Sequence, residues 1–154
     1  MKSIAVLPSL PSLPASIAAP STQRWRATAA VAAGVVAVIA LSLGTDVALR
    51  AAGIFPTVPQ RMASGLYVLA AAYRTLYGAL GSYLAARLAP RRPMAYALGL
   101  GGFGFVTSLM GALATWNNGP EFGPHWYPLT LVVTALPAAW LGGRLSRAAA
   151  RARQ

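Results

Sequence analysis

The stretch from Trp25 to Leu43, WRATAAVAAGVVAVIALSL, decides the fold class of this chain. No charged residue lies between Arg26 and Asp46. A run of about 20 apolar residues, wound as an α-helix that rises about 1.5 Å per residue, crosses a hydrocarbon layer about 30 Å thick. The sequence therefore predicts a membrane-spanning helix over residues 25–46.

Further apolar stretches of similar length follow along the chain. We expect them to form three more spans, over residues 63–89, 94–116 and 126–143. Pro90 and Pro93 flank a basic pair after the second span and should end that helix, because proline interrupts helical hydrogen bonding. The predicted fold is an all-α, integral-membrane four-helix bundle over residues 24–145. A flexible Pro/Ser-rich tail over residues 1–23 would precede it, and a basic tail over residues 146–154 would follow.

The composition of the whole chain also indicates lipid as its solvent. Of the 154 residues, 56% are hydrophobic and only 10% are charged, whereas a typical soluble domain has about 25% charged residues. The sequence contains no cysteine, which excludes disulfides, thiolate metal sites and cysteine nucleophiles. An ordinary soluble enzyme domain, a disordered regulator and a disulfide-rich secreted module are therefore excluded.

The distribution of charge predicts the orientation of the bundle. The net charge is +11, from 13 basic and 2 acidic residues. Ten of the basic residues flank the N-terminal end, the connection between the second and third spans, and the C-terminal end; only Arg50 and Arg61 flank the opposite face. Basic residues concentrate on the cytoplasmic side of membrane proteins. We therefore expect a multi-pass inner-membrane protein with both termini in the cytoplasm, where anionic lipids rather than nucleic acid attract the basic residues.

Arg74 is the most informative single residue, because it lies in the middle of the second span. An arginine near the bilayer centre is unfavourable by about 2.5 to more than 10 kcal/mol, so it should be buried and paired. Asp46 is the natural partner: it lies about 30 Å along its helix from Arg26, and Arg74 lies about 20 Å from Arg87. Two roles remain open, a structural ion pair between the first two helices and a binding site for an anion or a proton.

Small residues recur at helical spacing on two of the spans. On the second span they include Gly78 and Gly81, and on the third they include Gly101, Gly104 and Gly111. Small residues allow close approach of neighbouring helices in membranes, so we expect these glycines to serve helix packing.

The second and fourth spans also end on similar sequences. Residues 83–88, YLAARL, resemble residues 140–145, WLGGRL, in the order aromatic, Leu, two small residues, Arg, Leu. One interpretation of this similarity is a duplicated helical hairpin. Convergence of helix ends at one membrane interface is the alternative.

The outer connection between the third and fourth spans contains Glu121 and His125. Two ligands are too few for a closed metal site, and a single histidine with two acids supplies no credible catalytic set. We therefore expect no enzymatic activity, no cofactor and no bound metal. Turn residues and an interfacial Trp126 explain the segment better.

Several segments together carry a resemblance to a known group of proteins. They are residues 73–94, which include YRTLYG and GSYLAARLAP, residues 123–128, GPHWYP, and residues 141–145, LGGRL. This pattern resembles a family of small, uncharacterised four-span bacterial inner-membrane proteins. The resemblance covers about residues 44–145, implies a bacterial inner membrane and implies no activity.

Two functions remain as predictions. The first is an accessory or structural membrane component that is non-enzymatic and belongs to a homo-oligomer or a larger membrane complex. The second is a small homo-oligomeric transporter or channel with Arg74 and Asp46 in its pathway.

Overall fold

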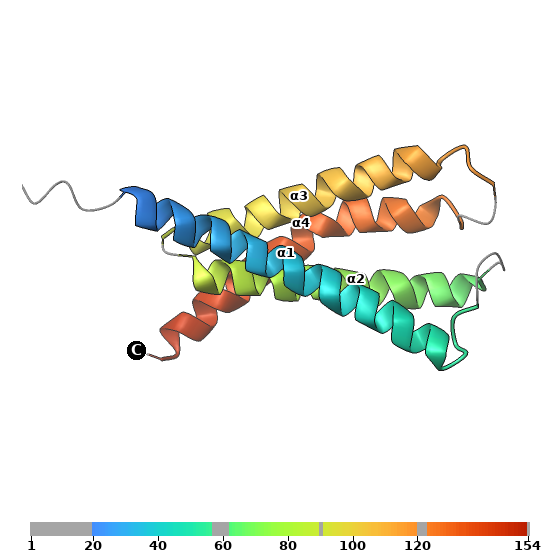
Figure 1. Cartoon of the computed structure of the whole chain (residues 1–154), viewed down its shortest axis with the longest axis horizontal. Helices are drawn as coiled ribbons and strands as arrows, with labels where there is room; N and C mark the ends of the chain where they lie inside the picture. The colour runs from blue at the N-terminus through green and yellow to red at the C-terminus, as the bar shows by residue number, and fades with distance from the viewer. Residues whose placement is uncertain (1–19, 57–61, 90, 120–122, 154) are drawn as a thin grey trace, which may run out of the picture.

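The computed structural model describes residues 20–56, 62–89, 91–119 and 123–153, and these residues form an all-helical structure. Its helices are α1 (Pro20–Ala51), α2 (Ser64–Leu88), α3 (Pro93–Thr115) and α4 (Trp126–Arg151). The predicted all-α class is therefore confirmed. The helices run back and forth, so the start of α1 and the end of α4 lie at the same end of the molecule (Figure 1).

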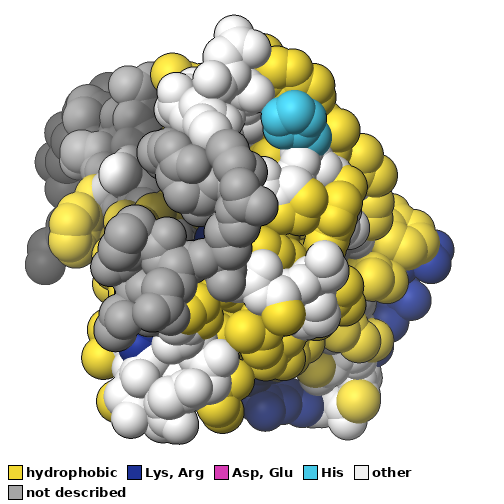
Figure 2. Space-filling model, turned by 90° about the vertical axis from the view of Figure 1, so that its right-hand side faces the viewer, with side chains coloured by type: hydrophobic (Ala, Val, Ile, Leu, Met, Phe, Trp, Pro, Cys, Tyr) yellow, Lys and Arg dark blue, Asp and Glu magenta, His cyan; other side chains and the backbone are white. Residues whose placement is uncertain are grey.

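Three of the helical segments are long and apolar enough to cross a membrane. They are Trp25–Ala51 within α1, the whole of α3 and the whole of α4. Large apolar side chains on these helices point outward, including Val36, Met110 and Val133, which are 63%, 65% and 70% exposed. Apolar surface of this kind indicates a membrane protein, because exposing apolar side chains to water along whole helices is energetically unfavourable. Figure 2 views the end with the α1–α2 and α3–α4 connections and shows hydrophobic side chains around the sides.

α2 is the exception in composition, and it takes a central place in the packing. It carries Arg74 in its middle and does not belong to the three apolar segments. It nevertheless packs against α1, α3 and α4, and its buried residues are mostly small, such as Ala70, Ala85 and Ala86. With 25 residues it is about 37 Å long, enough to run the length of the bundle.

Glycines set the closest helix contacts. A Cβ added at Gly34 of α1 would lie 2.8 Å from the carbonyl oxygen of Gly81 on α2, and one added at Gly81 would lie 2.9 Å from that of Gly34. On α4, a Cβ at Gly142 would collide with the Ala79 carbonyl oxygen of α2 and lie 2.8 Å from a second backbone atom, the Tyr83 nitrogen. These helices therefore approach one another through their backbones, as small residues permit in membranes.

Of the five glycines that we predicted to serve helix packing, some lie in close helix contacts and others do not. Gly81 contacts α1, and Gly101 lies against the Ala135 and Ala139 region of α4. A Cβ added at Gly78, Gly104 or Gly111 would meet no atom within 4 Å. These three glycines therefore make no close helix contact within one chain and lie beside open space, contrary to the packing prediction.

The helix ends differ from the predicted boundaries at both termini. α1 begins at Pro20, inside the predicted tail 1–23, because proline fits the first position of a helix. It extends to Ala51 and stops at Gly53, whose φ of +72° suits glycine. α4 continues to Arg151, so most of the predicted basic tail is helical, as expected for a run of alanine and arginine. Residues 1–19 of the predicted tail lie outside the described residues.

Candidate functional site

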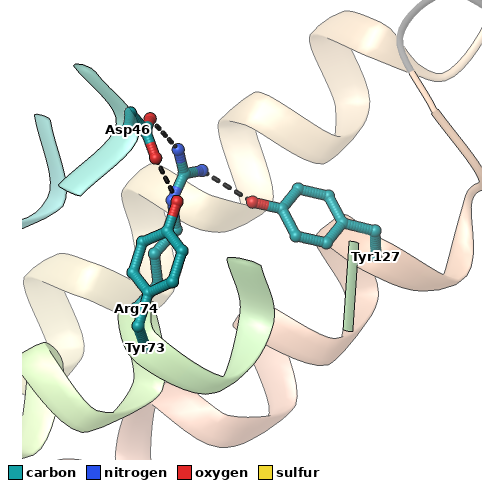
Figure 3. Close-up of polar contacts among 4 residues, drawn as sticks. All are labelled: Asp46, Tyr73, Arg74 and Tyr127. Atoms are coloured by element: carbon teal, nitrogen blue, oxygen red, sulfur yellow. Dashed lines mark hydrogen bonds and ion pairs between the residues drawn. The ribbon is translucent and has the colours of Figure 1, made fainter. Parts of the chain in front are cut away.

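Asp46 lies near the C-terminal end of α1, and its side chain turns into the bundle. It is only 7% exposed. Its Oδ1 accepts a hydrogen bond from the Tyr73 hydroxyl of α2, and its Oδ2 lies 2.7 Å from Nη2 of Arg74 (Figure 3). Both oxygens of this buried carboxylate are therefore occupied by donors from α2, as a buried charge requires.

Arg74 connects the helices around it. Besides the ion pair with Asp46 of α1, its Nη1 donates a hydrogen bond of 2.7 Å to the Tyr127 hydroxyl of α4 (Figure 3). Its Nε is buried and has no hydrogen-bond partner among the described residues. The guanidinium thus joins α1, α2 and α4 through a single side chain, and the pair with Asp46 cancels its charge. We call Asp46, Tyr73, Arg74 and Tyr127 the polar cluster.

Aromatic and polar contacts surround this cluster. The rings of Tyr67 and Tyr127 lie 5.4 Å apart. Thr45 of α1 and Tyr77 of α2 are hydrogen-bonded at 2.8 Å. Phe55, which follows α1, is 5% exposed and packs in one apolar group with Ala70 and Tyr73. These contacts keep the ion pair in a low-dielectric setting, where electrostatic attraction is strong.

A cavity of about 380 Å³ lies beside the polar cluster, and all four helices line it. Arg74 is the charged residue of its lining, and its side chain is 35% exposed. Hydroxyl-bearing residues from each helix line the wall together with apolar side chains: Ser42, Thr75, Ser82, Thr107, Ser108 and Thr134. Gly78 and Gly104, two of the glycines with open space beside them, also belong to the lining. The cavity therefore results in part from the missing side chains at these positions.

The outer-loop candidates do not form a site in the described residues. Glu121 lies outside these residues. The ring of His125 stacks on Trp116 with centroids 4.6 Å apart, and its Nε2 donates to the Trp116 carbonyl oxygen at 3.1 Å. His125 is exposed at this end of the molecule, where Figure 2 shows a histidine. Within the described part of the chain, no group of three metal-ligating side chains occurs.

Sequence reasoning did not find the two tyrosines of the polar cluster. Tyr73 precedes Arg74, and Tyr127 lies in the first turn of α4. An arginine inside a helical bundle has five N–H donors and needs more than one acceptor. That requirement points to hydroxyl-bearing residues on the facing helices, but several tyrosines and threonines could have met it.

Comparison with known protein families, with curated proteins and with solved structures finds no match for this chain.

Proposed function

We propose that this chain is a four-span inner-membrane protein without catalytic activity of its own, which serves as an accessory or structural membrane component. The observation that supports this role is the polar cluster, in which Arg74 bonds to Asp46 of α1 and to Tyr127 of α4. An arginine that is paired in this way holds helices together instead of reacting with a substrate. The basic groups at one end of the bundle would place both termini in the cytoplasm.

The proposed fourth span is α2. α1, α3 and α4 pack against it, and Asp46 neutralises the one charge in its middle. A span whose polar groups are paired within the bundle can cross a membrane with fewer apolar residues than one that exposes its polar groups to lipid. This explains how a helix of lower hydropathy can cross the membrane.

The non-catalytic role is supported by how the two described titratable candidates are engaged. Asp46 is held by Arg74 and Tyr73, and His125 is held by Trp116. General acid–base catalysis requires a group that can reach a substrate proton. In this arrangement, Asp46 is buried against its donors and is not presented to a bound substrate.

The second candidate function is a small homo-oligomeric transporter or channel. The cavity of about 380 Å³ favours it, because Arg74 and six hydroxyl-bearing residues line a space between the four helices. Ionisable residues inside membrane proteins often mark solute or proton pathways. In this alternative, Arg74 and Asp46 would lie in the pathway.

The variant Arg74→Met distinguishes the two functions. Wild type and variant are purified in mild detergent, their assembled mass is determined, and both are reconstituted in vesicles to measure chloride and proton flux. The structural role predicts loss of the assembled species in the variant and no flux from the wild type. Unchanged assembly, together with wild-type flux that the variant loses, would contradict the structural role and support transport.

A further inference from the structure

The end of the bundle that carries the chain termini has a pocket of about 550 Å³ between the last turns of α2 and the C-terminal part of α4. Four arginines line it: Arg87 from α2, and Arg147, Arg151 and Arg153 from α4 and the residues after it. Alanines, Ser146 and Pro93 complete the lining. We call this set of residues the arginine pocket.

No opposite charge balances these arginines within the described chain. Only Asp46 and Glu121 are acidic in the whole sequence. Asp46 is buried against Arg74 near the other end of the bundle, and Glu121 lies outside the described residues, in the connection between α3 and α4. Like charges that gather around one pocket repel one another. The described arrangement therefore lacks a counter-anion.

The geometry of α4 brings the arginines together. Arg147 and Arg151 are four residues apart, so they lie on the same face of the helix. The apolar stretch of α4 ends near Gly143, but the helix continues to Arg151, through most of the segment that the sequence predicts to be a tail. Arg147 and Arg151 share a helix face because of this extension. Arg87 approaches from α2 and stays close to Tyr83, with its Nη1 3.2 Å from the tyrosine hydroxyl.

In the proposed four-span arrangement, the arginine pocket would lie at the depth of a membrane interface. Tyr83 and Trp140 lie one turn before Arg87 and Arg144, and the guanidinium of Arg144 stacks on the Trp140 ring at 4.1 Å. Aromatic side chains of this kind mark the level of lipid headgroups. Arginine, in turn, binds phosphate oxygens through paired N–H donors.

We propose that the arginine pocket binds the phosphate headgroup of an anionic phospholipid of the cytoplasmic leaflet. The pocket supplies the positive charge and the paired donors, and the neighbouring apolar surfaces of α2 and α4 contact the acyl chains. Basic pockets between transmembrane helices on the cytoplasmic side suit such headgroups. This inference rests on the proposed four-span arrangement, which brings the pocket to that leaflet.

Native mass spectrometry of the purified full chain in mild detergent tests the inference. Dioleoyl phosphatidylglycerol is titrated against the wild type, R147Q/R151Q and R91Q/R92Q. The first double variant removes two arginines of the pocket, and the second removes two arginines of the same end that do not line it. At about 1 kcal/mol per arginine, R147Q/R151Q should weaken binding roughly 30-fold, and R91Q/R92Q by less than about threefold.

Three results would overturn the inference. They are an equal loss of binding in both double variants, equal affinity of the wild type for dioleoyl phosphatidylcholine, and displacement of the lipid by an equal concentration of inorganic phosphate. The first would indicate unspecific attraction, the second apolar adhesion, and the third a free anion as the ligand. Because the titration is done in detergent, its outcome is independent of the number of spans, which cysteine labelling determines separately.

Discussion

Asp46→Asn should lower the free energy of unfolding by about 3–5 kcal/mol, because it leaves the arginine in the middle of α2 without its counter-charge. The substitution keeps the size of the side chain but removes the negative charge that lies 2.7 Å from Arg74 Nη2. Arg74→Met should be destabilising for the converse reason, since it leaves the carboxylate unpaired. Unfolding in mixed micelles of mild detergent and dodecyl sulfate, followed by circular dichroism, measures both changes.

The double variant Asp46→Asn/Arg74→Met is the control for this prediction. It removes both charges, so its destabilisation should be smaller than the sum of the two single changes by at least about 2 kcal/mol. Strict additivity of the two changes would contradict the pairing. An effect of Asp46→Asn below about 1 kcal/mol would mean that Arg74 does not depend on Asp46.

Gly142→Ala should be the most damaging single-methyl change in the helix contacts. Its Cβ would collide with the Ala79 carbonyl oxygen and lie 2.8 Å from the Tyr83 nitrogen, and both are backbone atoms of α2. A side chain could rotate away, but backbone can only move with its helix. We therefore expect separation of α2 from α4 and a loss of about 1–3 kcal/mol, measured by the same unfolding method.

Gly111→Ala provides the matched control on α3. A Cβ at this position meets no atom within 4 Å, so the substitution adds a methyl group without a collision. Alanine favours a helix over glycine by up to about 1 kcal/mol, so the variant should be neutral or more stable. Equal destabilisation by the two substitutions would contradict the glycine contacts described above.

The sequence alone predicted the helical class and most of the helix positions. Long, mostly apolar stretches indicate where helices lie, and the predicted stretches 63–89 and 94–116 lie within a residue of α2 and α3 at each end. The proximity of Asp46 to Arg74 could be predicted because residue counts give height along a helix, and only one acid lay near the right level. The structure brings these two residues together.

Other features could not be predicted, because they depend on how the helices rotate and diverge. Gly81 and Gly78 occur on the same small-residue stretch of α2, yet only Gly81 touches α1. The bonding of Tyr127 to Arg74 across 53 positions also depends on the angle at which α4 crosses α2. α4 continues to Arg151, although residues 146–154 were predicted to be a tail. A basic composition does not by itself end a helix, and alanine and arginine both favour the helical conformation.

Cysteine labelling tests the central claim, that α2 crosses the membrane as a fourth span around a neutralised arginine. The chain has no cysteine of its own, so single cysteines can be placed at Ala52, Arg91, Asn118 and Ala152, which are all exposed between or after the helices. In spheroplasts, a membrane-impermeant maleimide should label positions 52 and 118 at once, and positions 91 and 152 only after the membrane is opened. Labelling of positions 52 and 91 from the same side would contradict the account, because α2 would then not cross the membrane.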